Sequence, residues 1–139
     1  MEQEFRELGL VTNLAFSKDT DDPDLYLLKF HSLKIDQTNI QITAGASRIL
    51  WYYLTEFLFP ASSNLTSRVS TASVSLPTSL SVAFVIKVEK GSDDLIKVVA
   101  LSAVHGWLFS FNLDEGGELW ADLDQTLRTI PGDKKVYRL

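Results

Sequence analysis

Residues 80–113, LSVAFVIKVEKGSDDLIKVVALSAVHGWLFSFNL, decide the fold. Their first part alternates with a period of two, as expected of a strand with one buried face; the apolar positions are Leu80, Val82, Phe84, Ile86 and Val88. Residues 90–94, KGSDD, predict a turn, because glycine accepts positive φ and Ser and Asp hydrogen-bond to nearby backbone. Two further apolar runs flank His105 and Gly106. This stretch therefore predicts two or three long strands folded back on one another as a sheet core.

Length and composition limit the class of protein. With 139 residues and no cysteine, the chain is expected to form one domain, 1–139, without disulfides or thiolate metal sites. The net charge of −5 disfavours a nucleic-acid partner. No apolar run approaches the about 20 residues that span a bilayer, and the acidic N-terminus lacks the layout of a signal peptide. We therefore expect a cytoplasmic protein that binds neither nucleic acid nor membrane.

The N-terminal part of the chain has a mixed pattern. Residues 2–10 favour a short helix, although Gly9 weakens it, and residues 10–16 suit a strand or a loop. Residues 18–24, KDTDDPD, predict a loop because Pro and Asp disfavour regular structure. Residues 25–35 predict a strand, and Ile40 and Ile42 mark a short return strand.

Two helices are expected. Residues 48–59 have helical length, with Ser47 as the N-cap and Pro60 as the end. Residues 118–130 carry an apolar stripe at helical spacing, although residues 118–122 would also suit a hairpin strand after the turn-like 114–117. Residues 61–79 are rich in Ser and Thr and are expected to be flexible or to lead into an edge strand. The predicted fold is α+β, with an antiparallel sheet of about five strands packed against one long aromatic-rich helix and a C-terminal helix.

Chemistry-bearing motifs are few. Of the two histidines, His31 falls within a predicted strand and His105 at a turn or bulge, and neither has a nucleophile or a second histidine at motif spacing. Residues 112–117 imitate the start of an EF-hand loop, but position 12 of that loop is Leu123 instead of the required Glu. The sequence contains no phosphate-binding glycine loop and no G-x-S-x-G motif. These observations favour a protein that is not an enzyme and needs no cofactor or metal.

The prediction of function therefore depends on which side chains the predicted helices and strands leave on the surface. The aromatic residues of the 48–59 helix exceed what one apolar face requires, which favours an interaction or assembly module that forms a homodimer or binds another protein. The expected interface consists of Arg48, Trp51, Tyr52, Thr55 and Phe59. A second hypothesis is a small-molecule pocket, or a weak enzyme, between helix and sheet, with His31, His105 and Trp107 as its lining. A third hypothesis is calcium binding by the acidic loops at residues 19–24 and 112–117.

Overall fold

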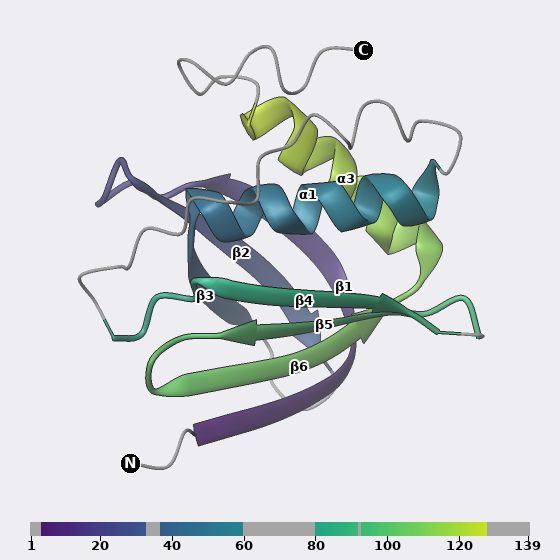
Figure 1. Cartoon of the computed structure of the whole chain (residues 1–139), viewed down its shortest axis with the longest axis horizontal. Coiled ribbons are helices and arrows are strands. Elements are labelled where there is room, and N and C mark those ends of the chain that lie inside the picture. The colour runs from purple at the N-terminus through teal and green to yellow at the C-terminus, as the bar shows by residue number, and fades with distance from the viewer. Residues whose placement is uncertain (1–3, 33–36, 60–79, 92, 128–139) are drawn as a thin grey trace.

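The computed structural model describes residues 4–32, 37–59, 80–91 and 93–127. Six strands form one sheet in the order β3-β2-β1-β6-β5-β4, and two helices lie together on one side of the molecule (Figure 1). The fold is therefore α+β, as predicted, but with six strands. In chain order the elements are β1 (Glu4–Lys18), β2 (Leu25–Ser32), β3 (Thr38–Thr43), α1 (Ala44–Leu58), β4 (Val85–Lys90), β5 (Ile96–Leu101), β6 (His105–Phe111) and α3 (Leu113–Leu127). The predicted flexible segment 61–79 lies outside the described residues.

Strand β1 corrects two predictions. The expected helix at residues 2–10 is wrong, since this segment is the first half of a 15-residue strand. The sheet is mixed rather than antiparallel, because β1 pairs in parallel with β6 and antiparallel with β2. Register shifts at Glu7/Gly9 and at Thr12/Ala15 mark two bulges. Because of these bulges, successive buried residues of β1 are three, three and two positions apart; they are Leu8, Val11, Leu14 and Phe16. This spacing departs from the alternation of a regular strand and resembles the apolar spacing of a helix.

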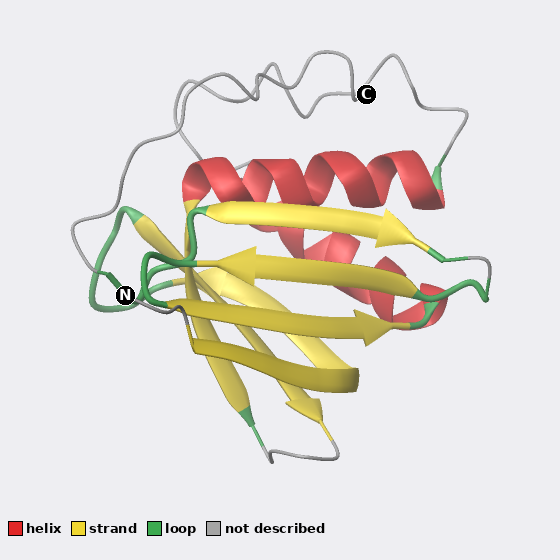
Figure 2. Ribbon diagram, turned by 60° about the horizontal axis from the view of Figure 1, so that its bottom comes forward, coloured by secondary structure: helices red, strands yellow, loops and turns green. Residues whose placement is uncertain are grey.

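The bulges divide the sheet into two halves that share β1. Residues 4–10 of β1 pair with β6, and residues 11–18 pair with β2. Figure 2 shows the strands of the two halves running in different directions. Gly9 (φ 69°) and Asn13 (φ 56°) adopt the left-handed conformation at the bulges. Helix α3 bonds the backbone here: the Asn13 N–H donates to Glu115 Oε2 at 3.1 Å, and the Phe16 N–H donates to Asp122 Oδ2 at 3.2 Å.

The two outer strands of the sheet are joined at one end. The Thr43 N–H donates to the Ala83 carbonyl at 3.0 Å, and the Ala83 N–H donates to the Gln41 carbonyl at 2.8 Å. These bonds connect the end of β3 to the residues before β4, so the sheet curls towards a barrel. The predicted strand from residue 80 is consequently shorter, because residues 80–84 turn to reach β3 and β4 begins at Val85.

Both helices begin earlier than predicted. Thr43, not Ser47, caps α1, and its side chain accepts from the Ala46 N–H at 3.2 Å. Ser47 is instead buried in the first turn, where its hydroxyl donates to the Thr43 carbonyl. Helix α3 begins at Leu113, after Asn112 accepts from the Glu115 N–H at 2.8 Å. The helical interpretation of residues 118–127 is thus confirmed, and the hairpin alternative is wrong.

A continuous apolar core fills the space between the two halves of the sheet and the helices. Helix α1 packs on β4 and β3, and α3 packs on β1 and on α1. Within the described ranges, neither helix has the length and apolar character needed to cross a bilayer. The largest fully buried side chains include Phe30, Trp51, Phe109 and Phe111.

The two adjacent glycines of α3 differ sharply in their surroundings, and they give a matched test of its packing. A Cβ atom at Gly117 would meet nothing within 4 Å, whereas one at Gly116 would lie 3.2 Å from Ile96 Cδ1 and 3.3 Å from Phe111 Cε1. We expect Gly117→Ala to raise the free energy of unfolding by about 0.5–1 kcal/mol through helix propensity. Gly116→Val should lower it by about 1–3 kcal/mol through overpacking. Urea denaturation measures both, and equal effects at the two positions would contradict the packing of α3 on β5 and β6.

Candidate functional site

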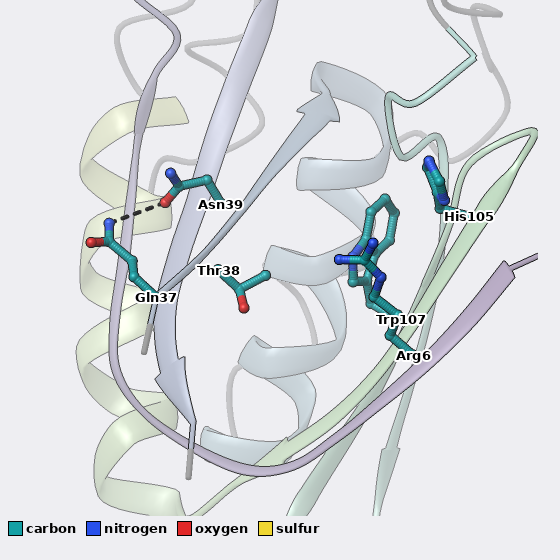
Figure 3. Close-up of a pocket in the computed structure, with 6 residues that line it drawn as sticks. All are labelled: Arg6, Gln37, Thr38, Asn39, His105 and Trp107. Carbon is teal, nitrogen blue, oxygen red and sulfur yellow. Dashed lines mark hydrogen bonds between the residues drawn. The ribbon is translucent and has the colours of Figure 1, made fainter. Parts of the chain in front are cut away.

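A cavity of about 220 Å³ lies at the end of the interior where β3 and β6 begin. Arg6 comes from β1, His105 and Trp107 come from β6, and Gln37, Thr38 and Asn39 lie at the start of β3. Figure 3 shows these two groups on opposite sides of the cavity. The cavity therefore brings together three segments that are far apart in the chain.

The first wall of the cavity is built by strand pairing. Arg6 and Trp107 are register partners in the parallel β1–β6 pair, so their side chains share one face of the sheet. His105 lies two residues before Trp107 on the same face, with the two rings 5.8 Å apart. Trp107 is only 7% exposed and continues the interior row of Phe109 and Phe111. Arg6 is exposed at the mouth, so the wall combines a buried aromatic side chain with basic and imidazole groups.

The opposite wall contains a buried hydroxyl group. Thr38 is the first residue of the inward row that continues with Ile40 and Ile42, and it is the register partner of Phe30. Thr38 is 9% exposed, and its Oγ1 atom is buried with no hydrogen-bond partner among the described residues. A buried polar group left without a partner costs about 1–3 kcal/mol. An aliphatic side chain would avoid that cost at this position, so Thr38 is the feature of the cavity that most needs an explanation.

Two amide side chains border Thr38. Gln37 Nε2 donates to Asn39 Oδ1 at 3.1 Å. This bond uses the acceptor of the Asn39 amide and leaves its N–H groups as donors. Both amide side chains are exposed and point away from Arg6 and His105 in Figure 3, so the group that this wall turns inward is the Thr38 hydroxyl.

Comparisons of the chain with protein-family models, with curated proteins and with solved structures found no match. Function must therefore be argued from the chemistry of the cavity itself. No carboxylate is found among the described residues that line it. The arrangement suits recognition of a bound molecule through hydrogen bonds and charge.

The residues predicted to line a pocket are only partly brought together. His105 and Trp107 line the cavity, whereas His31 lies exposed on β2 as the register partner of Thr12 and is not part of the lining. Arg6 and residues 37–39 were missed by the sequence analysis. Arg6 lies in a segment expected to be helical, and residues 37–39 in one expected to be a turn. Nothing in their local pattern connects them, because their proximity depends on β1 pairing with β6.

The predicted interface on α1 is divided by the packing of α3. Trp51 and Thr55 are fully buried within the chain. The Trp51 indole N–H donates to Asp124 Oδ1 at 3.2 Å, and the Trp120 indole N–H donates to Thr55 Oγ1 at 2.8 Å. Neither Trp51 nor Thr55 is therefore available on the surface of the chain.

The rest of the predicted interface keeps some exposure. Arg48 and Tyr52 are half-buried. Phe59 is exposed, and the centroid of its ring lies 4.8 Å from that of the Trp120 ring. Tyr53 of the same helix is also exposed. Self-association through α1 stays a prediction. The aromatic side chains of α1 and its end that keep some exposure for it are Tyr52, Tyr53 and Phe59.

The acidic loop before β2 uses its carboxylates internally. Asp19 Oδ1 accepts from the Asp21 N–H at 2.8 Å and from the Asp22 N–H at 3.2 Å, while Asp19 Oδ2 accepts from Gln41 Nε2 at 3.0 Å. The second acidic segment, residues 112–117, forms the start of α3. In the part of the chain that the structure describes, no three His, Asp or Glu side chains are placed to hold a metal ion. The geometry therefore gives no support to the calcium hypothesis.

The hydrogen bonds of Asp19 predict a pH-dependent contribution to stability. The bond from Gln41, followed by those from the backbone, lowers the pKa of Asp19 from its ordinary value of 3.8. A carboxylate with a lowered folded-state pKa stabilises the fold above its ordinary pKa and loses that contribution as the pH falls through the lower value. We expect Asp19→Ala to reduce the melting temperature slightly at about pH 7, and the difference from the wild type to shrink below about pH 3. A difference that stays constant across this range would contradict the assignment.

Proposed function

We propose that this protein binds a small molecule in the cavity between the starts of β3 and β6. The observation that carries the proposal is the Thr38 hydroxyl, which is buried beside the cavity with no hydrogen-bond partner among the described residues. A polar group that a fold buries at a cost in stability is a frequent property of functional sites, where a ligand supplies the missing bond. Arg6, His105 and Trp107 line the same cavity from the other side, which supports this interpretation.

The size and lining of the cavity agree with binding of a small ligand. A volume of about 220 Å³ corresponds to several water molecules at about 30 Å³ each. It lies below the about 300–1,000 Å³ of sites for drug-sized ligands. One aromatic wall and a few converging polar groups are the usual composition of such sites. The proposed ligand is therefore compact and polar, with a limited apolar part.

The three tryptophans provide a direct test of this proposal. Trp107 lines the cavity, whereas the indole N–H groups of Trp51 and Trp120 are bonded to Asp124 and Thr55 between the two helices. In a nuclear magnetic resonance screen of small fragments of mixed charge, we expect ligands to shift the indole N–H signal of Trp107. The signals of Trp51 and Trp120 should stay in place and serve as internal controls.

Assignment of the three signals uses Trp107→Phe and Trp120→Phe. Fragments that shift only the Trp51 or Trp120 signals would reject the cavity as the binding site. A screen in which no fragment shifts Trp107, at fragment concentrations of about 1–10 mM where even weak affinities of about −4 kcal/mol are detected, would reject the proposed function.

A further inference from the structure

We propose that a second copy of this chain binds to the outer face of the half-sheet made by β1, β6, β5 and β4. The outer face is the side of these strands that is turned away from the apolar core. In Figure 2 the strands of this half lie in front, with the helices behind and above them. Arg6 and Trp107 point to the opposite face, so the proposal is independent of the ligand cavity.

The row of this face nearest the turn between β5 and β6 is apolar. Strand pairing places side by side Val85, Leu101, Gly106 and Phe5. A Cβ atom at Gly106 would lie 2.5 Å from Phe5 Cδ2 and 3.1 Å from Leu101 Cδ2, so these two side chains meet over the glycine. Phe5 is nevertheless 48% exposed. The row therefore presents a phenyl ring that lies against the sheet and keeps half of its surface open, which is typical of a surface that takes part in association.

The next row of the same face carries opposite charges at its two ends. In order from β4 to β1, it consists of Lys87, Val99, Leu108 and Glu7. Lys87 and Glu7 are exposed, and the two apolar residues between them are half-buried. Read across the strands, the row is a cation, two apolar side chains and an anion.

This order makes the face complementary to itself. We consider two copies stacked face to face about a two-fold axis that runs along the strands between β5 and β6. The β4 strand of each copy then lies over β1 of the other, so Lys87 faces Glu7 of the second copy on both sides of the axis. The apolar row covers the apolar row of the second copy. An axis across the strands would instead bring Glu7 to Glu7 and Lys87 to Lys87, so the charges select the first arrangement.

Charge also explains why two acidic chains would meet on this face. The chain has a net charge of −5, so two copies repel each other over much of their surface. The charged residues that the three register rows of this face contain are two lysines and two glutamates, namely Lys87, Lys97, Glu7 and Glu89. Their charges cancel, so the repulsion is locally weakest here.

The size of the face predicts a weak dimer. Four strands about 4.8 Å apart and about five residues long at 3.3 Å each cover roughly 300–400 Å². Interfaces that bury less than about 1,200 Å² in total belong to weak and transient complexes. We therefore expect a dissociation constant of about 0.01–0.5 mM.

Sedimentation velocity of the full chain from about 10 μM to 1 mM tests the proposal, and two charge reversals make the test specific. Lys87→Glu and Glu7→Lys should each weaken the dimer by about 10-fold, because each creates two pairs of like charges. Glu7→Lys also reduces the net negative charge of the chain, so a general repulsion between copies would predict a stronger dimer. An equimolar mixture of the two variants should dimerise as well as wild type, because both facing pairs are again opposite in charge.

Two further variants separate this face from helix α1. Phe5→Ser should weaken the dimer by about 10-fold, because it removes the exposed ring of the apolar row. Tyr53→Ala, on the exposed side of α1, should leave the dissociation constant unchanged. Circular dichroism confirms that each variant is folded.

Three results would overturn the proposal. One is a chain that stays monomeric at 1 mM. Another is a dimer that Tyr53→Ala weakens and Phe5→Ser does not, which would assign self-association to α1. The third is a mixture of Lys87→Glu and Glu7→Lys that dimerises no better than either variant alone, which would exclude the two-fold arrangement.

Discussion

Replacing Trp51 with Ala is expected to lower the free energy of unfolding by about 3–5 kcal/mol. Trp51 is fully buried in α1, and its indole N–H donates to Asp124 Oδ1 of α3 at 3.2 Å. The substitution removes a large apolar side chain and a buried hydrogen bond between the two helices. Small domains have total stabilities of about 5–15 kcal/mol, so this single change should remove a large share. Chemical denaturation measures the effect directly.

Two variants separate the sources of this loss. Trp51→Phe keeps most of the aromatic area and removes the N–H group, so it should cost about 1–3 kcal/mol, the range for leaving a buried polar group unbonded. Tyr53→Ala removes an aromatic residue from the same helix at a site that is 37% exposed, and it should cost less than about 1 kcal/mol. If Tyr53→Ala were as damaging as Trp51→Ala, the assignment of the buried face of α1 would be refuted.

Phe30→Ala is expected to have the second large effect, about 3–5 kcal/mol. The Phe30 side chain is fully buried, and its ring lies 4.5 Å from that of Phe109. This contact joins the two halves of the sheet, because β2 carries Phe30 and β6 carries Phe109. The loss therefore combines the transfer of a large apolar group to water with a cavity that the curved sheet cannot easily close.

Phe30→Leu is the matched control for this position, because it keeps much of the apolar volume and should cost less than about 1.5 kcal/mol. Phe30 is also the register partner of Thr38, so the alanine variant should enlarge the cavity beside Thr38 at its inner end. A loss below about 1 kcal/mol for Phe30→Ala would mean that the two halves of the sheet are not held together by this ring pair.

Several features of the fold follow from the sequence without any structure. The apolar alternation of residues 80–113 predicted the strands that became β4, β5 and β6, and the turn between β4 and β5 was placed correctly. The turn between β5 and β6 was not, because His105 and Gly106, which were expected at a turn or bulge, are the first residues of β6 and the chain turns at residues 102–104. The apolar stripe after residue 118 predicted α3 through Leu127. These elements were accessible because period two and period 3.6 are local properties, set by the geometry of strands and helices.

The start of each helix was predicted poorly, for a physical reason. A capping side chain works only where the chain direction changes, and Thr43 and Asn112 hold those positions because strands β3 and β6 end beside them. Local pattern could not separate Thr43 from Ser47, since both residue types can cap a helix.

Strand β1 and the cavity were decided by the tertiary structure. The two bulges of β1 disrupt its alternation, and at the second bulge the N–H groups of Asn13 and Phe16 are bonded by acids of α3 about a hundred residues later. The parallel pairing of β1 with β6 then puts Arg6 beside Trp107. The curl of the sheet brings residues 37–39 to the other side of the same cavity. The sequence alone indicated His105 and Trp107, but it could not indicate Arg6 or Thr38, because what makes these residues notable is their distant neighbours and the burial of one hydroxyl.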